Sequence, residues 1–373
     1  MSEIDKKKAL KKERLLELEQ MELVRQEEVK QDGLFYLLLL GVQFLPLFDS
    51  FVPLASRLYF YIVATTTVYV GGKLTPASSD DTEIVSRKSA LLAPLGASAS
   101  ILIFYSLLKL GLDPTKVYAV IVTLFGAIAI SDVGVPLLRN VFDNDNSDAF
   151  ATTQIKLPPF LAEAFDQESL PLDGVLALFL GVVAVGIYWW PVDMTQKFIV
   201  SNLIAWAIGM VSLGSISLGS TQTGVILLLG LFCYDIFWVF GTDVMMTVAT
   251  KVEAPIKFIY ARSSATPSIS TSYPFSVLGL GDVIIPGLFV RFLQQVDEGL
   301  QPEKFSYFDA GAIAYAIGLA VCFVVNQISG AGQPALLYLD PACVGSAFLV
   351  ALANNQVPDL WNFALPEPEE TRT

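Results

Sequence analysis

The sequence predicts an all-α, polytopic membrane protein: a helix bundle of nine core transmembrane helices with an additional short hydrophobic segment near the N-terminus. Hydrophobic residues make up 54% of the 373 residues, and only 16% are charged. A soluble protein of this length usually carries about a quarter charged residues. The apolar residues also form separate blocks, most of them near the ~20 residues that a membrane-spanning helix needs. These observations favour a bundle that is embedded in lipid.

The blocks divide the chain into five stretches. Residues 1–32 are a charged segment that we expect to be helical and solvated, and residues 33–52 hold the short hydrophobic segment. A first group of membrane helices occupies 53–215, a second group occupies 216–355, and an acidic tail follows at 356–373. The predicted spans lie at 53–71, 90–110, 114–138, 173–190, 197–215, 221–241, 275–295, 308–328 and 333–353.

The sequence leaves open whether the hydrophobic block 33–48 crosses the membrane. Lys and Arg are enriched on the cytosolic side of membrane proteins, and their distribution here favours a cytosolic N-terminus. That count takes ten spans, with the block 33–48 as the first of them.

The composition excludes several classes of function. The net charge is −13, and the acids gather in the predicted extramembrane segments, so no nucleic-acid surface is expected. The chain contains no histidine, which rules out Ser/His and Cys/His catalysis and the common histidine-based zinc sites. No ligand set for a metal is visible, and we expect neither a metal ion nor a cofactor.

Two aspartates lie inside consecutive predicted spans. Asp235 is in the middle of "LLLGLFCYDIFWVFGTDVMM", and Asp282 is in "SVLGLGDVIIPGLF". An acid at this depth costs about 2.5–3.5 kcal/mol on insertion scales, so each one indicates a function. Both are expected six residues from the same membrane face. Because consecutive spans run antiparallel, the two carboxyl groups can meet.

Two carboxyl groups that share a site cannot both ionise, so one keeps a proton while the other acts as a base. The base takes a proton from water, and the acid protonates the scissile carbonyl oxygen. This is the chemistry of aspartic proteases, and it needs neither histidine nor metal. The titration belongs to the pair, so neither role is assigned to one aspartate.

Other residues are predicted to shape the site around the two acids. Glycines at 279 and 281 permit close backbone approach, and Tyr234 offers either a hydroxyl group or a wall. Pro334 lacks an N–H and suits an irregular helix start, which membrane proteins tolerate beside a cavity. The complete set of candidate site-shaping residues is Tyr234, Gly279, Leu280, Gly281, Gln333, Pro334, Ala335 and Leu336.

The motifs "YD" at 234–235, "GLGD" at 279–282 and "QPAL" at 333–336 resemble those of the presenilin and signal peptide peptidase family of intramembrane aspartyl proteases. The resemblance covers roughly residues 53–355. It implies nine spans, with the acids in the sixth and seventh, the N-terminus on the luminal side and the C-terminus in the cytosol. It also implies that the protein cleaves type II-oriented transmembrane helices, such as leftover signal peptides, in the endoplasmic reticulum membrane. Transmembrane helical peptides and the lipid bilayer would be its partners, and a homo-oligomer is compatible with the family.

The sequence departs from the family pattern in three places. The block 33–48 is additional to the nine spans, and the tail lacks a dilysine retrieval signal. Asp340 stands in "LLYLDPACVG" where the family usually has an apolar residue. It is either an acid that modulates the pair or a residue that faces a polar crevice.

Two other classes of function remain open at this point. Paired intramembrane acids and broken helices also suit a proton- or cation-coupled membrane transporter. No inverted repeat of the acid-bearing segment is visible, which counts against transport. A membrane scaffold that binds its substrates without cutting them is the third class.

Overall fold

Long helices make up most of the computed structural model, which describes residues 37–48, 55–74, 82–141, 153–156, 169–261, 275–330 and 332–365. The long helices among these residues are α2 (Ser56–Leu74), α3 (Arg87–Lys109), α4 (Thr115–Val141), α7 (Leu172–Trp189), α8 (Met194–Ser215), α9 (Thr221–Phe240), α11 (Gly281–Leu300), α12 (Tyr307–Ser329) and α13 (Leu336–Asn354). Seven of them, all except α2 and α11, are long and apolar enough to cross a membrane. The predicted all-α, polytopic membrane bundle is confirmed.

The N-terminal hydrophobic segment is described from residue 37 onwards. Residues 37–43 are helical, and η1 (Leu45–Phe48) follows as a 3-10 turn. At ~1.5 Å per residue the described part of the segment is far shorter than the ~30 Å of a bilayer core. It packs against the bundle, since Leu39 and Gln43 are buried and the Tyr59 hydroxyl donates a hydrogen bond to Gln43 Oε1 at 3.5 Å. The charged segment 1–32 and the tail beyond 365 lie outside the described residues.

In the described part of the chain, three short two-stranded sheets accompany the helices. Strand β1 (Glu83–Val85) pairs in parallel with β4 (Ile216–Leu218), and β2 (Gln154–Lys156) pairs antiparallel with β3 (Ser169–Pro171). The third sheet joins β5 (Lys257–Ala261) and β6 (Phe275–Gly279) in antiparallel register. The sequence analysis missed these strands because a run of three to five residues is too short to reveal a period of two.

Strand β6 corrects the predicted span at 275–295. The first five residues of that block form the strand, and α11 begins only at Gly281. The expectation that Asp282 lies six residues inside a helix is therefore wrong, because it stands in the first turn of α11.

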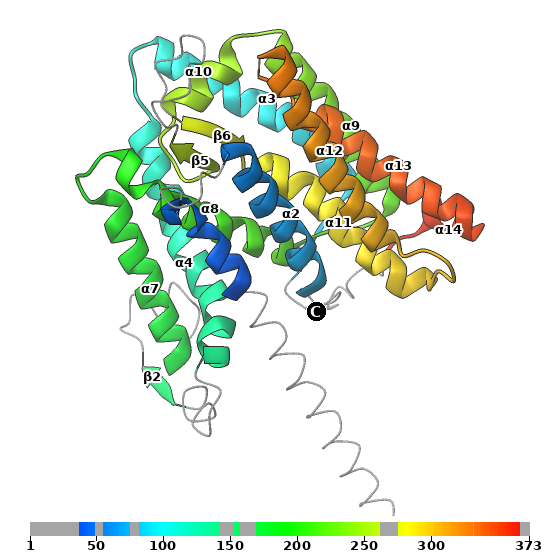
Figure 1. Ribbon diagram of the computed structural model, residues 1–373, viewed down its shortest axis with the longest axis horizontal. Helices are drawn as coiled ribbons and strands as arrows, with labels where there is room; N and C mark the ends of the chain where they lie inside the picture. Colours follow the sequence, from blue (N-terminus) through cyan, green and yellow to red (C-terminus); the bar gives the residue numbers. More distant parts are fainter. Residues whose placement is uncertain are drawn as a thin grey trace, which may run out of the picture.

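The helices that carry the motifs lie together on one side of the molecule. Helix α13 packs against α12, α9 and α11, and α11 also packs against α2. Figure 1 shows α9, α11, α12 and α13 side by side, with β5 and β6 near one end of α11. Two short helices complete this part of the chain: α10 (Val244–Lys251) follows α9, and α14 (Val357–Asn362) follows α13.

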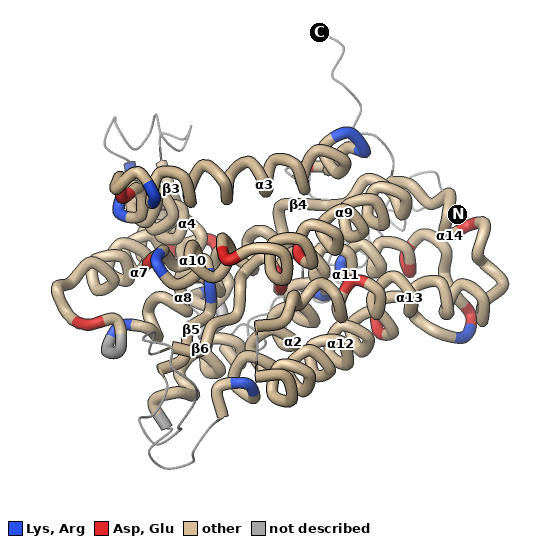
Figure 2. The backbone as a smooth tube through the Cα atoms, turned by 90° about the horizontal axis from the view of Figure 1, so that it is seen from above, with Lys and Arg blue, Asp and Glu red and all other residues tan. Residues whose placement is uncertain are grey.

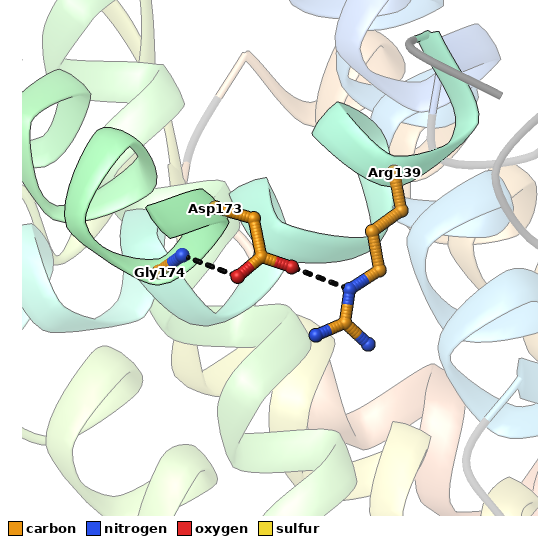
Figure 3. Close-up of polar contacts among 3 residues, drawn as sticks. All are labelled: Arg139, Asp173 and Gly174. Carbon is orange, nitrogen blue, oxygen red and sulfur yellow. Dashed lines mark hydrogen bonds and ion pairs between the residues drawn. The ribbon is translucent and has the colours of Figure 1, made fainter. Parts of the chain in front are cut away.

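Helices α4 and α7 form a separate pair, which Figure 1 shows on the opposite side from α13. Asp173, in the first turn of α7, is buried and accepts a hydrogen bond from Arg139 Nε of α4 at 2.6 Å (Figure 3). Its other oxygen accepts from the Gly174 N–H at 2.7 Å. Helix α3 runs along one edge of the bundle (Figure 2) with exposed apolar residues such as Leu95 and Ile103, as a lipid-facing helix would.

Candidate active site

Asp235 is buried in the C-terminal half of α9, with 4% of its surface exposed. Its Oδ2 accepts a hydrogen bond from the backbone N–H of Leu336 at 3.0 Å. Leu336 is the first residue of α13, where a helix has N–H groups without intrahelical partners. The QPAL segment thus contacts the acid of the YD segment directly, although 101 residues separate them.

Asp282 stands in the first turn of α11, where the helix dipole favours a negative charge. It is partly exposed, unlike Asp235. A Cβ built on Gly279 would lie 3.1 Å from Asp282 Oδ2, so the carboxyl group lies close over this glycine. From α12, the buried Tyr315 donates its hydroxyl hydrogen to the backbone oxygen of Asp282 at 3.4 Å.

The carboxyl groups of Asp235 and Asp282 interact electrostatically with one another. The sequence analysis expected this meeting from the antiparallel order of the two spans. Among the described residues, no ion pair includes either acid. Two neighbouring carboxyl groups without a cation form the arrangement in which one proton is shared.

The other predicted site residues have different surroundings. Tyr234 is partly buried and packs with Trp238, at 6.3 Å between ring centroids, and its hydroxyl group interacts electrostatically with both acids, so the wall and the hydroxyl interpretation both stay predictions. Gln333 donates to Ser329 Oγ and accepts from the Tyr338 hydroxyl, both at 3.0 Å, so it holds the turn before α13. Three further predicted site residues are buried: Leu280, Pro334 and Ala335. Gly281 is exposed.

The β5–β6 sheet adds residues that the sequence analysis missed. Asn202, on α8, donates to the Ile259 oxygen at 2.8 Å and accepts from the Ile259 N–H at 2.9 Å. Both backbone groups of Ile259 therefore point away from β6, and the outer edge of β5 is closed. An asparagine inside an apolar span, in "KFIVSNLIAWAIG", was the available signal.

The hydrogen bonds between Asn202 and Ile259 determine which backbone groups of β6 point away from β5. Val277 lies opposite Ile259, and opposed residues of an antiparallel pair either exchange both hydrogen bonds or neither. The N–H and C=O of Val277 therefore point outward, and they have no hydrogen-bond partner among the described residues. Strand β6 thus offers an open edge that leads, through Gly279 and Gly281, to Asp282.

Lys257 lies opposite Gly279 in the same sheet, outside the spanning helices. It is buried and donates to the Ala249 carbonyl oxygen at 2.5 Å. Burial lowers the pKa of Lys257 to about 8, because desolvation outweighs the charge of Glu253. Among the described residues, no three His, Cys, Asp or Glu side chains are grouped so that they could hold a metal ion.

Comparisons with known proteins show the family to which the chain belongs. A sequence model of the signal peptide peptidase family matches residues 77–367, which include all three motifs. The chain is 32% identical over 299 residues to the signal peptide peptidase of Mus musculus, covering 79% of this chain and 77% of the relative. The human (Homo sapiens) signal peptide peptidase is 31% identical over 298 residues, with the same two coverages. Intramembrane protease 2 of Caenorhabditis elegans is 36% identical over 182 residues, or 46% of this chain and 39% of the relative. The resemblance found in the sequence is confirmed: the chain belongs to the signal peptide peptidase family and is an intramembrane protease.

Proposed function

We propose that this protein is an intramembrane aspartyl endopeptidase in which Asp235 and Asp282 form the catalytic pair. The observation that carries the proposal is the pairing of two carboxyl groups, from α9 and α11, without a cation among the described residues. In this proposal residues 216–355 form the catalytic region, and the helices of 53–215 surround it. The substrates are transmembrane helices, such as leftover signal peptides, in the endoplasmic reticulum membrane.

The pair would act through one bound water molecule. The ionised carboxyl group takes a proton from the water as its oxygen attacks the scissile carbonyl carbon, and the protonated carboxyl group gives its proton to the carbonyl oxygen. Breaking of the C–N bond in the resulting gem-diol returns one proton to the pair and places one on the leaving amine. The Leu336 N–H holds one oxygen of Asp235, which leaves the other oxygen for the water or for Asp282.

The open edge of β6 supports a way of presenting the substrate. A peptide bond inside a helix is hidden from water, so the substrate must unwind before it is cut. An extended segment can add to an exposed strand edge through its main chain. Pairing at Val277 would direct such a segment along β6 toward Asp282, past Gly279, Leu280 and Gly281. Tyr234 and the residues of QPAL would line the other side.

The proposal is tested with the purified full chain and a signal-peptide-like helical peptide, with the products identified by mass. We expect cleavage by the wild type and by Asp132→Asn, which changes an exposed acid on α4. We expect none from Asp235→Asn or Asp282→Asn, and inhibition of the wild type by a peptide with a hydroxyl in place of the scissile carbonyl. Substantial cleavage by either dyad variant would refute the assignment. Proton uptake into liposomes without cleavage would instead indicate the transporter.

A further inference from the structure

A third acid faces the proposed dyad from α13. Asp340 lies one helical turn after Leu336, whose N–H binds Asp235, and residues four apart share a helix face. Only 3% of Asp340 is exposed. Its carboxyl group interacts electrostatically with both Asp235 and Asp282. The site therefore gathers three carboxyl groups, from α9, α11 and α13.

Asp340 has no structural partner that would explain its burial. Among the described residues, neither of its side-chain oxygens has a hydrogen-bond partner. It precedes Pro341, which lies inside the helix and leaves a backbone oxygen without its usual donor. The Asp340 side chain makes no bond to that oxygen or to any other described group. A buried carboxylate in such surroundings is costly, so the group is expected to be protonated at rest.

Within the described part of the chain, the titratable groups around Asp340 include no cation. The helices that pack against α13 are α9, α11, α12 and α14. Asp359 of α14 lies toward the far end of α13, where it interacts with Tyr307. The groups that face the cluster are Asp235 and Tyr234 from α9, Asp282 from α11, Tyr315 and Cys322 from α12, and Cys343 on α13 itself. Tyrosine and cysteine are neutral near pH 7, so the charge state of the cluster is decided by its three aspartates.

We propose that Asp340 is a third acid of this centre, which acts through the dyad and keeps one proton on it as the pH rises. The inference rests on the proposed function. The working state of the dyad holds one proton, and its loss ends catalysis on the alkaline side. As the pH rises, Asp340 gives up its own proton, and its negative charge then makes loss of the proton that remains on the dyad less favourable. Asp340 therefore extends the working range of the dyad to higher pH. In this proposal Asp340 influences where the proton resides and does not touch the substrate.

The test is the pH–rate profile of reporter cleavage by the purified Asp340→Asn and Asp340→Leu variants. We expect the alkaline limb of both to move to lower pH by roughly one unit, with the rate at low pH within about threefold of the wild type. Both variants remove a buried acid that has no partner, so their thermal midpoints should equal or exceed that of the wild type. Asp132→Asn is the matched control, an acid outside the cluster whose loss should leave the profile unchanged.

The inference is overturned if both Asp340 variants keep the wild-type profile, or lose rate by the same factor at every pH. Lower thermal midpoints with an unmoved profile would assign Asp340 a structural role instead. Failure of the dyad itself gives a different result, because Asp235→Asn or Asp282→Asn would then remain active whatever the Asp340 variants do.

Discussion

Two regions of this bundle bury aspartates in opposite surroundings. Between α4 and α7, Asp173 is bound by Arg139 at 2.6 Å and by the Gly174 N–H at 2.7 Å. Among α9, α11 and α13, three carboxyl groups converge, and the only donors that the described residues supply to their side chains are two backbone N–H groups, those of Leu336 and Gly279. A fold selected for stability alone would pair or remove such acids. The comparison therefore separates an acid that holds two helices together from the acids that we propose for catalysis.

The largest expected effect on the cleavage rate comes from replacing an acid of the proposed dyad. Asp282→Asn should lower the cleavage rate by at least ~10³-fold, since two groups that share one task fail together. Asp173→Asn keeps a hydrogen-bonding side chain beside Arg139 and should cleave within about threefold of the wild type. The rates are measured on purified, correctly folded protein. Equal losses in the two variants would erase the distinction.

The helix start that contacts Asp235 gives the next largest effect. Pro334 is buried and lies in the irregular segment before α13. In Pro334→Leu, a residue with an N–H lets α13 extend backwards, which shifts the Leu336 N–H from Asp235. We expect about a 10- to 100-fold fall in kcat, with little loss of folded protein. A wild-type rate would show that the QPAL segment acts only as packing.

The two glycines of the GLGD motif should differ in how strongly an alanine substitution lowers the cleavage rate. A Cβ at 279 would press on Asp282 Oδ2 at 3.1 Å, whereas a Cβ at 281 would meet only Ile285 Cδ1, at 3.8 Å. Gly279→Ala should therefore cost about tenfold in cleavage, and Gly281→Ala less than about threefold. The reverse order in a side-by-side assay would contradict the geometry around Asp282.

The smallest effect on activity is expected at the ion pair of Arg139 and Asp173. Arg139→Gln removes the cation from the buried Asp173 and should lower the free energy of unfolding by about 1–3 kcal/mol. The cleavage rate per folded molecule should not change. Thermal denaturation and kinetics on the same preparation measure both quantities. A large loss of catalysis without destabilisation would mean that the α4–α7 pair is coupled to the site.

Much of this arrangement could be predicted because its signals are local. Acids in apolar spans stand out, and antiparallel neighbours bring Asp235 and Asp282 together. The remainder depends on contacts between distant segments. The Leu336 N–H reaches Asp235 across 101 residues, and Asn202 closes the edge of β5 across 57. The short apolar run 275–279 fits a strand or a helix equally well, so only its pairing with β5 decides between them.

The central claim is that the carboxyl groups among α9, α11 and α13 share protons. Infrared difference spectroscopy measures this directly, through the carbonyl stretch that only a protonated carboxyl group has. Near pH 7, we expect the wild type to show protonated carboxyl bands that weaken in Asp282→Asn and in Asp340→Asn and persist in Asp173→Asn. Bands that are the same in the wild type, Asp282→Asn and Asp340→Asn would contradict the claim.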